Sequence, residues 1–437
     1  MNQVGSIFLQ RTRVAALQVR YYKHVGSCSE KMNAALLRAE MIASGELPAI
    51  SASSSNPEFE LLLVCCRKQN REEFVRLCKS LITNDFDWEI FLTLAQHHRL
   101  ISRAFSSLSE VSGFVPEQEL ESLRFRFQTH ARQSLLLNAE LFRIIECLKS
   151  AGIKAFPYKG PVLAQFLYGD VTARQFGDLD LLIHKSDLPE AKAALMELGY
   201  RASLEFTARE DKAYLAAGYE YTFDSERGRN LVELKWQILP QFYSVNFDIG
   251  AMFERAITVD LDGYFVRTFC VEDLFLVLCV HAAKHAWGQL SLLCDIAQLV
   301  KTQSLDWAVI RKRAFELGIQ RIVAVNLLLI NRLLRLETRI AIEERTASPL
   351  TEPIALKIKA GEEYDVESFT YCVLMMKLRE RWTDRVRFLW RLVFTPSTGE
   401  WSAVRLPAFL FPMYRVVRVW RLIRRFATFT QMSAKIF

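Results

Sequence analysis

Apolar residues recur at helical spacing through the first third of the chain. Three stretches show this period of three to four residues, and they are 58–82, 88–100 and 116–150. Asn56 and Pro57 suit the cap and the first turn of the first helix. We predict a helical region over 58–150. It follows a variable or disordered leader and linker over 1–57, which ends in a run rich in serine and proline.

The middle of the chain changes to short apolar runs that read as strands. The predicted elements are a strand at 153–160, a helix at 161–168, a strand at 178–183, a helix at 188–199, strands at 219–223 and 231–236 joined as a hairpin, and a hairpin at 257–269. Strands interleaved with helices are typical of mixed α and β structure. We therefore predict an α+β core over 151–270.

After residue 270 the helical period returns. We predict a helical region over 271–345, a break at "TASPLTEP" (346–353) and a basic helical tail over 346–437. No internal repeat is present.

The positive charge of the chain belongs to this tail. Residues 377–437 hold 13 lysines and arginines against 3 aspartates and glutamates, whereas the whole chain has a formal net charge of +7. The rest of the chain is therefore slightly acidic, so the charge gives no strong signal for nucleic acid.

The nine cysteines are odd in number, show no CxxC spacing and lie mostly in apolar runs. This pattern predicts buried free thiols in a reducing compartment, with little support for structural zinc. No apolar run reaches the roughly 18 residues that a spanning helix needs. We predict a cytoplasmic protein. Residues 1–29 are basic and free of acids, which keeps an organelle-type presequence open beside a variable leader.

Two aspartates, Asp178 and Asp180, open one of the predicted strands. Side chains alternate along a strand, so both carboxylates face one way while Leu179, Leu181 and Ile183 face the core. Carboxylates this close raise each other's pKa unless a cation intervenes. Hard oxygen ligands suit Mg2+ or Mn2+. Taken alone, the pair is more typical of a solvated strand edge.

Two neighbouring features change that interpretation. Lys159, Gly160 and Pro161 form a strand-to-helix turn, whose backbone N–H groups and positive helix end suit a phosphate. Glu233 is a third acid in a later strand. Three acids on neighbouring strands that face a phosphate-binding turn form the arrangement of two-metal phosphoryl transfer.

The ordered set of motifs resembles a known family. Lys-Gly, an arginine, Asp-x-Asp-Leu-Leu, an acid-x-x-Trp strand and "HAAKH" (281–285) resemble the bacterial uncharacterised nucleotidyltransferase family of the DNA polymerase beta superfamily. The resemblance runs from about Trp88 to the C-terminus. It includes tail positions, namely Pro396, Trp401, Leu406, Pro407, Tyr414 and Arg415. It implies a small polymerase-beta-like nucleotidyltransferase mixed sheet flanked by N-terminal and C-terminal helical regions.

The resemblance also implies roles for individual residues. Asp178, Asp180 and Glu233 would be the catalytic residues and the ligands of Mg2+ or Mn2+, and Glu233 would also accept the acceptor's proton. Lys159 and Gly160 would shape the turn that binds the nucleotide.

Arg174 would be a further nucleotide-binding residue, which meets the triphosphate or braces the aspartates. A plain salt bridge is as well supported. Three positions depart from the family pattern. Pro161 replaces a residue that would donate an N–H, Pro157 lies within the first strand, and Lys235 replaces a histidine. Lys235 is thus a candidate substrate contact.

A second group of polar residues follows at 281–295. If one helix continues through Gly288, the group shares an arc of about 100°, and its members are His281, Lys284, His285 and Asp295. The resemblance places this helix against the active-site cleft. Lys284 and His285 are therefore candidate nucleotide ligands, and His281 and Asp295 are candidate substrate contacts. Buried, hydrogen-bonded histidines remain the alternative.

The tail contains an amphipathic helix in "MYRVVRVWRLIRRFATF" (413–429). One arc is apolar, with Val416, Val419, Trp420, Leu422, Ile423 and Phe426. The opposite arc is basic, with Arg418, Arg421, Arg424 and Arg425. Three partners are open: the protein itself through the apolar arc, an anionic membrane surface, or nucleic acid. The basic arc lacks interleaved aromatics, which ranks nucleic acid last.

The best-supported function is a Mg-dependent nucleotidyltransferase that moves an NMP from an NTP to a hydroxyl, amine or phosphate acceptor and releases pyrophosphate. The acceptor, small molecule or macromolecule, and the identity of the NTP stay open. The alternatives are a catalytically degenerate nucleotide-binding or scaffold protein, and a toxin-like enzyme that nucleotidylates tRNA or protein.

Overall fold

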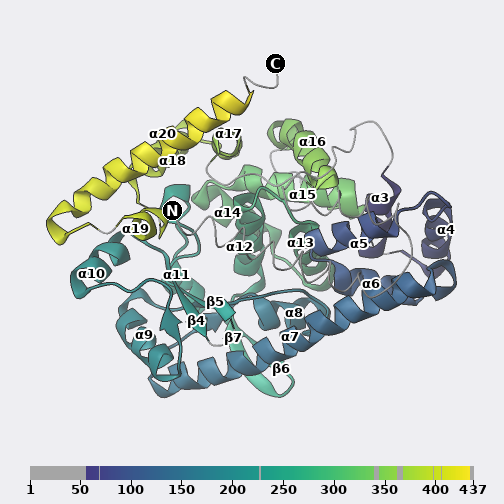
Figure 1. Cartoon of the computed structure of the whole chain (residues 1–437), viewed down its shortest axis with the longest axis horizontal. Helices are drawn as coiled ribbons and strands as arrows, with labels where there is room; N and C mark the ends of the chain where they lie inside the picture. Colours follow the sequence, from purple (N-terminus) through teal and green to yellow (C-terminus); the bar gives the residue numbers. More distant parts are fainter. Residues whose placement is uncertain are drawn as a thin grey trace, which may run out of the picture. The chain divides into compact units, whose positions relative to one another are not determined.

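The protein is described by a computed structural model that covers 56–67, 69–225, 228–338, 344–361, 368–396, 398–404 and 406–433. The chain divides into two compact units, 1–55 and 56–437, and all described residues belong to the second (Figure 1). Most of the predicted leader and linker over 1–57 therefore lies outside the described residues.

The N-terminal helical region forms as the apolar period predicts. Its elements are α3 (Pro57–Cys66), α4 (Arg71–Leu81), α5 (Trp88–His97), α6 (Ile101–Ser109), η1 (Ser112–Phe114) and the long α7 (Glu117–Ser150). The Asn56 side chain caps α3 by accepting a hydrogen bond from the Phe59 N–H at 2.9 Å. The Asn70 side chain caps α4 in the same way. This second cap splits the predicted 58–82 helix into two.

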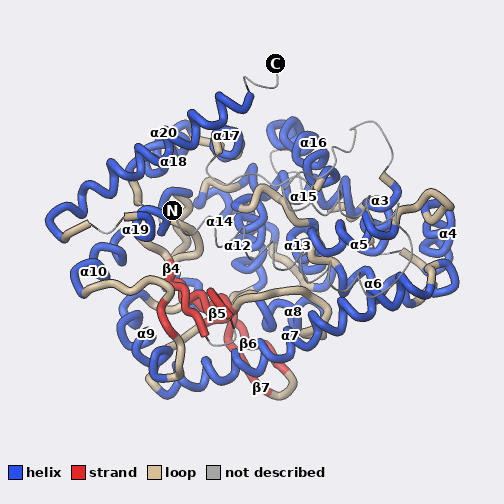
Figure 2. The backbone as a smooth tube through the Cα atoms, in the orientation of Figure 1, coloured by secondary structure: helices blue, strands red, loops and turns tan. Residues whose placement is uncertain are grey.

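The core contains a five-stranded mixed sheet in the order β1-β2-β5-β4-β3. Its strands are β1 (Phe156–Pro157), β2 (Leu179–Leu182), β3 (Arg201–Ala202), β4 (Glu220–Ser225) and β5 (Gly228–Lys235). They gather in one place among the helices (Figure 2). β2 and β5 pair in parallel, whereas the other neighbours pair antiparallel. Pro157 lies on an edge strand, where a missing N–H is tolerated. The mixed sheet confirms the α+β class.

The two faces of the sheet have different surroundings. Leu179, Leu181 and Ile183 share a buried apolar cluster with residues of α7 and α9, including Leu141 and Leu195. This packing confirms the predicted core direction of the strand. Because side chains alternate, the opposite face carries Asp180 on β2 and the polar positions of β5. The remaining elements of the core are α8 (Gly160–Tyr168), η2 (Lys185–Asp187), α9 (Leu188–Glu197), α10 (Ala208–Ala217), η3 (Gln241–Tyr243), α11 (Ile249–Glu254) and the hairpin of β6 (Ile257–Leu261) and β7 (Tyr264–Thr268).

Helices follow the core to the end of the described chain. They are α12 (Val271–Lys284), α13 (Leu290–Thr302), α14 (Trp307–Leu317), α15 (Gln320–Leu334), α16 (Glu344–Ala360), α17 (Phe369–Lys377), α18 (Trp382–Phe394), α19 (Thr398–Ala403), η4 (Ala408–Met413) and α20 (Tyr414–Ser433). Within the described ranges, no helix combines the length and apolar character needed to cross a membrane. The eight cysteines in these ranges are free, and all but Cys147 are buried.

The predicted break at 346–353 is wrong, because these residues lie inside α16. Pro349 and Pro353 are both within this helix, where each removes one backbone donor. Burial offsets that loss: Ala347, Ile354 and Ile358 are at most 1% exposed, and α16 packs on α15. Tertiary packing therefore outweighs the local propensity of the prolines.

The predicted continuation of one helix through Gly288 is also wrong. α12 ends at Lys284 and α13 begins at Leu290. Ala286 and Trp287 adopt positive φ angles of 46° and 54°. The Trp287 indole is fully buried and donates a hydrogen bond to the Asn326 side chain at 2.9 Å. Burial of this large side chain stabilises a turn that the helical period does not show.

The apolar arc of the C-terminal helix mostly faces outward, which disfavours docking of this arc on the protein itself. Val416, Trp420 and Ile423 are exposed, and of that arc Leu422 is buried. Arg418, which was predicted on the outer basic arc, is buried instead. Its guanidinium donates to the Leu392 carbonyl at 2.9 Å and lies 3.4 Å from Glu400. A buried ion pair thus sets the rotation of α20, and the side chains beyond Arg424 lie outside the described set.

Candidate active site around an acidic triad

Three carboxylates meet at the polar face of the sheet. Asp178 directly precedes β2, Asp180 lies within it, and Glu233 is the register partner of Asp180 on the parallel strand β5. One oxygen from each of the three lies within 4.8 Å of the others. Asp180 is buried, whereas Asp178 and Glu233 are half-buried. Strand register therefore assembles the triad that the sequence predicted.

The turn before α8 lies directly against this triad. Gly160 begins the helix with φ of +55°, and a Cβ there would lie 3.3 Å from the carbonyl oxygen of Asp178. A glycine is needed both for the left-handed conformation and for this close approach. Lys159, the residue before it, places its Nζ 3.3 Å from each carboxylate oxygen of Asp180. The predicted phosphate turn and the acids thus form one site.

Lys235 is the central cation of the site. Its Nζ lies 2.6 Å from Glu233, 2.8 Å from Asp180 and 3.1 Å from Glu220. The side chain is only 4% exposed. Glu220 lies on β4, directly opposite Lys235 in the register of the hairpin. A buried ammonium therefore joins three carboxylates from three adjacent strands.

Burial and the neighbouring lysines give the three acids of the triad different pKa values. Burial opposes ionisation of Asp180, but the ammonium groups of Lys159 and Lys235 hold its pKa well below the usual range. Burial, and then the charge of Asp180, raise the pKa of Asp178. Burial raises the pKa of Glu233 to about 7 against the attraction of Lys235. Asp180 is thus ionised at physiological pH, whereas Glu233 titrates near neutrality.

The end of α12 supplies a further group of basic residues to this face. Nζ of Lys284 lies 5.6 Å from the centroid of the Tyr219 ring, which Lys235 also contacts. Burial, and then the charge of Lys235, lower the pKa of Lys284 to about 8. The His281 and His285 rings pack edge to face, 4.6 Å apart. Burial, and then the charge of Lys159, lower the pKa of His281, so its imidazole is neutral at physiological pH.

Arg174 and Asp295 form a second ion pair beside the triad, in which Asp295 is buried and Arg174 half-buried. The Arg174 Nε lies 2.8 Å from the Asp295 carboxylate, which also accepts a hydrogen bond from the Tyr168 hydroxyl at 2.8 Å. Arg174 therefore makes the salt bridge that the sequence left open. Asp295 is 2% exposed, and it lies on α13, a helix distinct from α12. This geometry favours a structural role for Asp295, as the partner of Arg174 and Tyr168, over a contact with substrate.

The sequence analysis missed three side chains of the site. Glu220 and Tyr219 come from β4 and the residue before it, and Tyr158 donates a hydrogen bond to Asp180 at 3.5 Å. The signal that finds Glu220 is the register of the β4–β5 hairpin, which pairs Thr222 with Glu233 and Glu220 with Lys235. Residues two apart on paired strands share a face.

The donor set suits a hard divalent cation such as Mg2+. Three carboxylates offer oxygen ligands. Among the described residues, the Asp178 carboxylate makes no hydrogen bond or ion pair. Its pKa is raised, and a nearby positive charge would lower that pKa by stabilising the ionised carboxylate. Lys235 already occupies the space between Asp180 and Glu233. The residues therefore fit a cation on the Asp178 side of the triad best.

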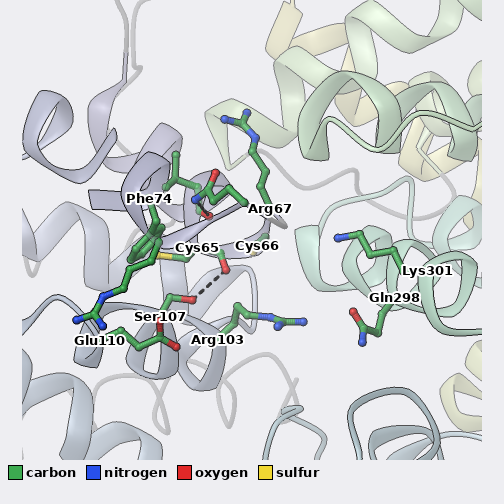
Figure 3. Close-up of a pocket in the computed structure, with 12 residues that line it drawn as sticks. Cys65, Cys66, Arg67, Phe74, Arg103, Ser107, Glu110, Gln298 and Lys301 are labelled. Carbon is green, nitrogen blue, oxygen red and sulfur yellow. Dashed lines mark hydrogen bonds between the residues drawn. The ribbon is translucent and has the colours of Figure 1, made fainter. Parts of the chain in front are cut away.

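A separate cavity lies between α3, α4, α6 and α13 (Figure 3). It has a volume of about 310 Å3, and Arg67, Arg71, Arg103 and Lys301 are among its lining residues. None of the lining residues belongs to the triad. Arg103 lies over the Tyr168 ring at 5.1 Å, so the cavity borders the Arg174–Asp295–Tyr168 network and not the acids.

Comparison with known proteins supports the sequence resemblance. Residues 84–335, more than half of the chain, match a protein family described as "Uncharacterised nucleotidyltransferase". No curated protein matches the chain. A solved structure of an antigenic nucleotidyltransferase-like protein from Paracoccidioides brasiliensis aligns with 48% of this chain and 94% of its own, at 16% identity and a TM-score of 0.26. That similarity is too weak to indicate a shared fold.

Proposed function

Because the chain belongs to the family of uncharacterised nucleotidyltransferases, we propose that it transfers a nucleoside monophosphate from an NTP to a hydroxyl, amine or phosphate acceptor and releases pyrophosphate. The observation that carries the proposal is the triad of Asp178, Asp180 and Glu233, with oxygen atoms within 4.8 Å, beside the turn at Gly160. This combination is the arrangement expected of phosphoryl transfer in the polymerase beta superfamily. We propose that the fold belongs to this superfamily.

Each residue of the site has a task that follows from its environment. Asp178 and Asp180 would hold Mg2+ or Mn2+, which when bound would neutralise the phosphates and lower the pKa of the acceptor hydroxyl. Asp180 stays ionised because two lysines face it. Glu233, with a pKa of about 7, is suited to accept the acceptor's proton near neutral pH.

The basic residues around the acids would bind the nucleotide. Lys159 and Lys284 bring positive charge to the same face of the sheet as the triad, and the backbone at Gly160 opens a helix whose N-terminal end favours anions. His281 and His285 lie beside Lys284 and would contact the nucleotide or the acceptor as neutral rings. Clustered cations act on the negative charge that develops during transfer.

Labelled nucleotides test this proposal directly. The protein is incubated with Mg2+ and each NTP carrying label on the α- or the γ-phosphate, together with a mixture of small-molecule and macromolecular acceptors. We expect α-label to move to an acceptor and this transfer to be lost in Asp180→Asn. Transfer of γ-label alone would show a kinase and refute the proposed reaction.

A second candidate function is a nucleotide-binding or scaffold protein without catalysis. Lys235 favours it, because its ammonium lies 2.6 Å and 2.8 Å from two of the three acids, where a second metal ion would compete with it. Thermal unfolding with Mg2+ and each NTP separates the cases. Stabilisation without label transfer supports a binding protein, and an unchanged melting curve with every NTP supports a scaffold.

A further inference from the structure

The C-terminal helices expose an unusual amount of apolar surface. In the described part of the chain, eleven of the twenty exposed large hydrophobic side chains lie between Trp382 and Ile423. Monomeric proteins rarely leave large contiguous apolar patches in water unless the patch binds something. Two helices carry most of these side chains, α18 and α20, and they contact each other (Figure 1).

α18 has a buried face and an apolar face on opposite sides. Phe388 and Leu392 are buried one turn apart. At about 100° per residue, the exposed apolar side chains fall on the other side of the helix. They are Trp382, Val386, Leu389, Trp390 and Phe394. Trp382 is 73% exposed and Trp390 65% exposed, so this stripe is not part of the core of the described unit.

α20 repeats this division. Its buried side carries Tyr414, Arg418 and Leu422, each four residues apart. Its outer side carries Val416, Trp420 and Ile423 within an arc of about 60°. The buried pair of Arg418 and Glu400 fixes which side faces in. The apolar stripe is therefore held outward by an interaction of the opposite face.

Arginines border both stripes. Arg415 and Arg387 are exposed, and the Arg424 guanidinium stacks over the Trp420 ring at 4.9 Å. Residues 377–437 as a whole hold 13 basic residues against 3 acidic ones, and of the basic residues Arg379 and Arg418 are buried. An apolar face with tryptophans, flanked by arginines, is the composition of helices that lie in the interface of an anionic membrane.

We propose that the outer faces of α18 and α20 form a peripheral docking surface for an anionic lipid bilayer. Charge complementarity favours this partner. Two copies of the chain would bring two strongly basic surfaces together, whereas phosphate headgroups neutralise the arginines while the tryptophans enter the boundary region. Docking on a bilayer needs neither nucleotide nor metal, so it stands independently of nucleotidyl transfer.

Vesicle flotation of the full-length protein tests the proposal. Phosphatidylcholine vesicles are compared with vesicles that also contain phosphatidylglycerol. We expect binding to the anionic vesicles at least about tenfold tighter than to the neutral ones, because each interfacial arginine adds to the attraction. Added salt should weaken the binding, since it screens these charges.

Two sets of variants locate the surface. Trp390→Ser combined with Trp420→Ser removes two exposed rings and should weaken vesicle binding at least about tenfold. The matched control is Phe125→Ser combined with Phe265→Ser. These rings are 72% and 70% exposed on other elements, so binding should not change. Arg415→Glu provides a second test that leaves every apolar contact in place.

Three results would overturn the proposal. In the first, the wild-type protein does not float with anionic vesicles. In the second, the phenylalanine control loses vesicle binding as strongly as the tryptophan variant. In the third, ultracentrifugation shows a self-association that the tryptophan variant abolishes, while no vesicle binding occurs. That last result would assign the surface to a second copy of the chain.

Discussion

Replacement of Lys235 by methionine tests whether this lysine is the built-in cation of the site. Methionine keeps the apolar stem and removes the charge. Asp180, Glu220 and Glu233 then lose a partner at 2.6–3.1 Å. Loss of one partner from a buried ion pair costs about 3–5 kcal/mol, since the remaining charge is left uncompensated. We expect a loss of unfolding free energy in this range.

The expected change in melting temperature follows from the size of the folding unit. An entropy of unfolding of about 2.1 cal/mol/K per residue gives roughly 0.8 kcal/mol/K for a unit that spans residues 56–437. A loss of about 3–5 kcal/mol then lowers the melting temperature by about 4–6 °C. Differential scanning calorimetry in the presence of a chelator measures this shift.

Divalent cations should partly restore the variant. Its acids have lost their ammonium, so Mg2+ should bind Lys235→Met more tightly and stabilise it more than the wild type. A bound ion contributes about 2.7 kcal/mol at a hundred times its dissociation constant. Lys192→Met is the matched control, because Lys192 pairs with Asp211 at 3.1 Å in a more exposed position and should cost only about 0.2–1 kcal/mol. A Lys235→Met protein as stable as the wild type, or one that gains nothing extra from Mg2+, would refute the reasoning.

Three more predictions concern the same site. Asp178→Asn should abolish label transfer yet preserve or raise the stability of the metal-free protein, because burial and the charge of Asp180 already raise the pKa of Asp178. Asp180→Asn should also abolish label transfer, but it should lower the stability. Equal unfolding curves for the two variants would contradict this asymmetry. The pKa of Glu233 is raised to about 7 in the folded protein. The contribution of this group to the free energy of unfolding is therefore fully present below about pH 4.3 and is lost as the pH rises through about 7. Denaturant unfolding across this pH range should show the loss in the wild type and not in Glu233→Gln. Gly160→Ala should cost about 1–2 kcal/mol because of its positive φ, and a thermal melt without any decrease would show that the turn accepts a side chain.

Much of the fold follows from apolar periodicity. The alternation of Leu179, Leu181 and Ile183 predicts both the strand and its buried side, and the structure confirms this packing. The N-terminal helices follow from their apolar period and from the Asn56 cap. Such local patterns suffice because each residue's exposure depends mainly on its place in one element.

The members of the acidic triad also follow from the sequence. Asp178 and Asp180 are separated by one residue, and Glu233 belongs to a later apolar strand. The partners of these acids do not follow. The register of β4 against β5 places Glu220 opposite Lys235, and no local pattern reports the pairing of side chains on different strands. Only the folded sheet shows that an ammonium already lies among the carboxylates.

The remaining differences arise where burial of one side chain outweighs a periodic pattern. Burial of Trp287 ends α12 at Lys284, and the buried pair of Arg418 and Glu400 turns the stripe of Trp420 outward. The sequence by itself determined which regions are helical and which are mixed, the buried side of β2 and the three acids. The tertiary structure decided their cations, the helix break and the exposed stripe, because these depend on contacts between residues far apart in the chain.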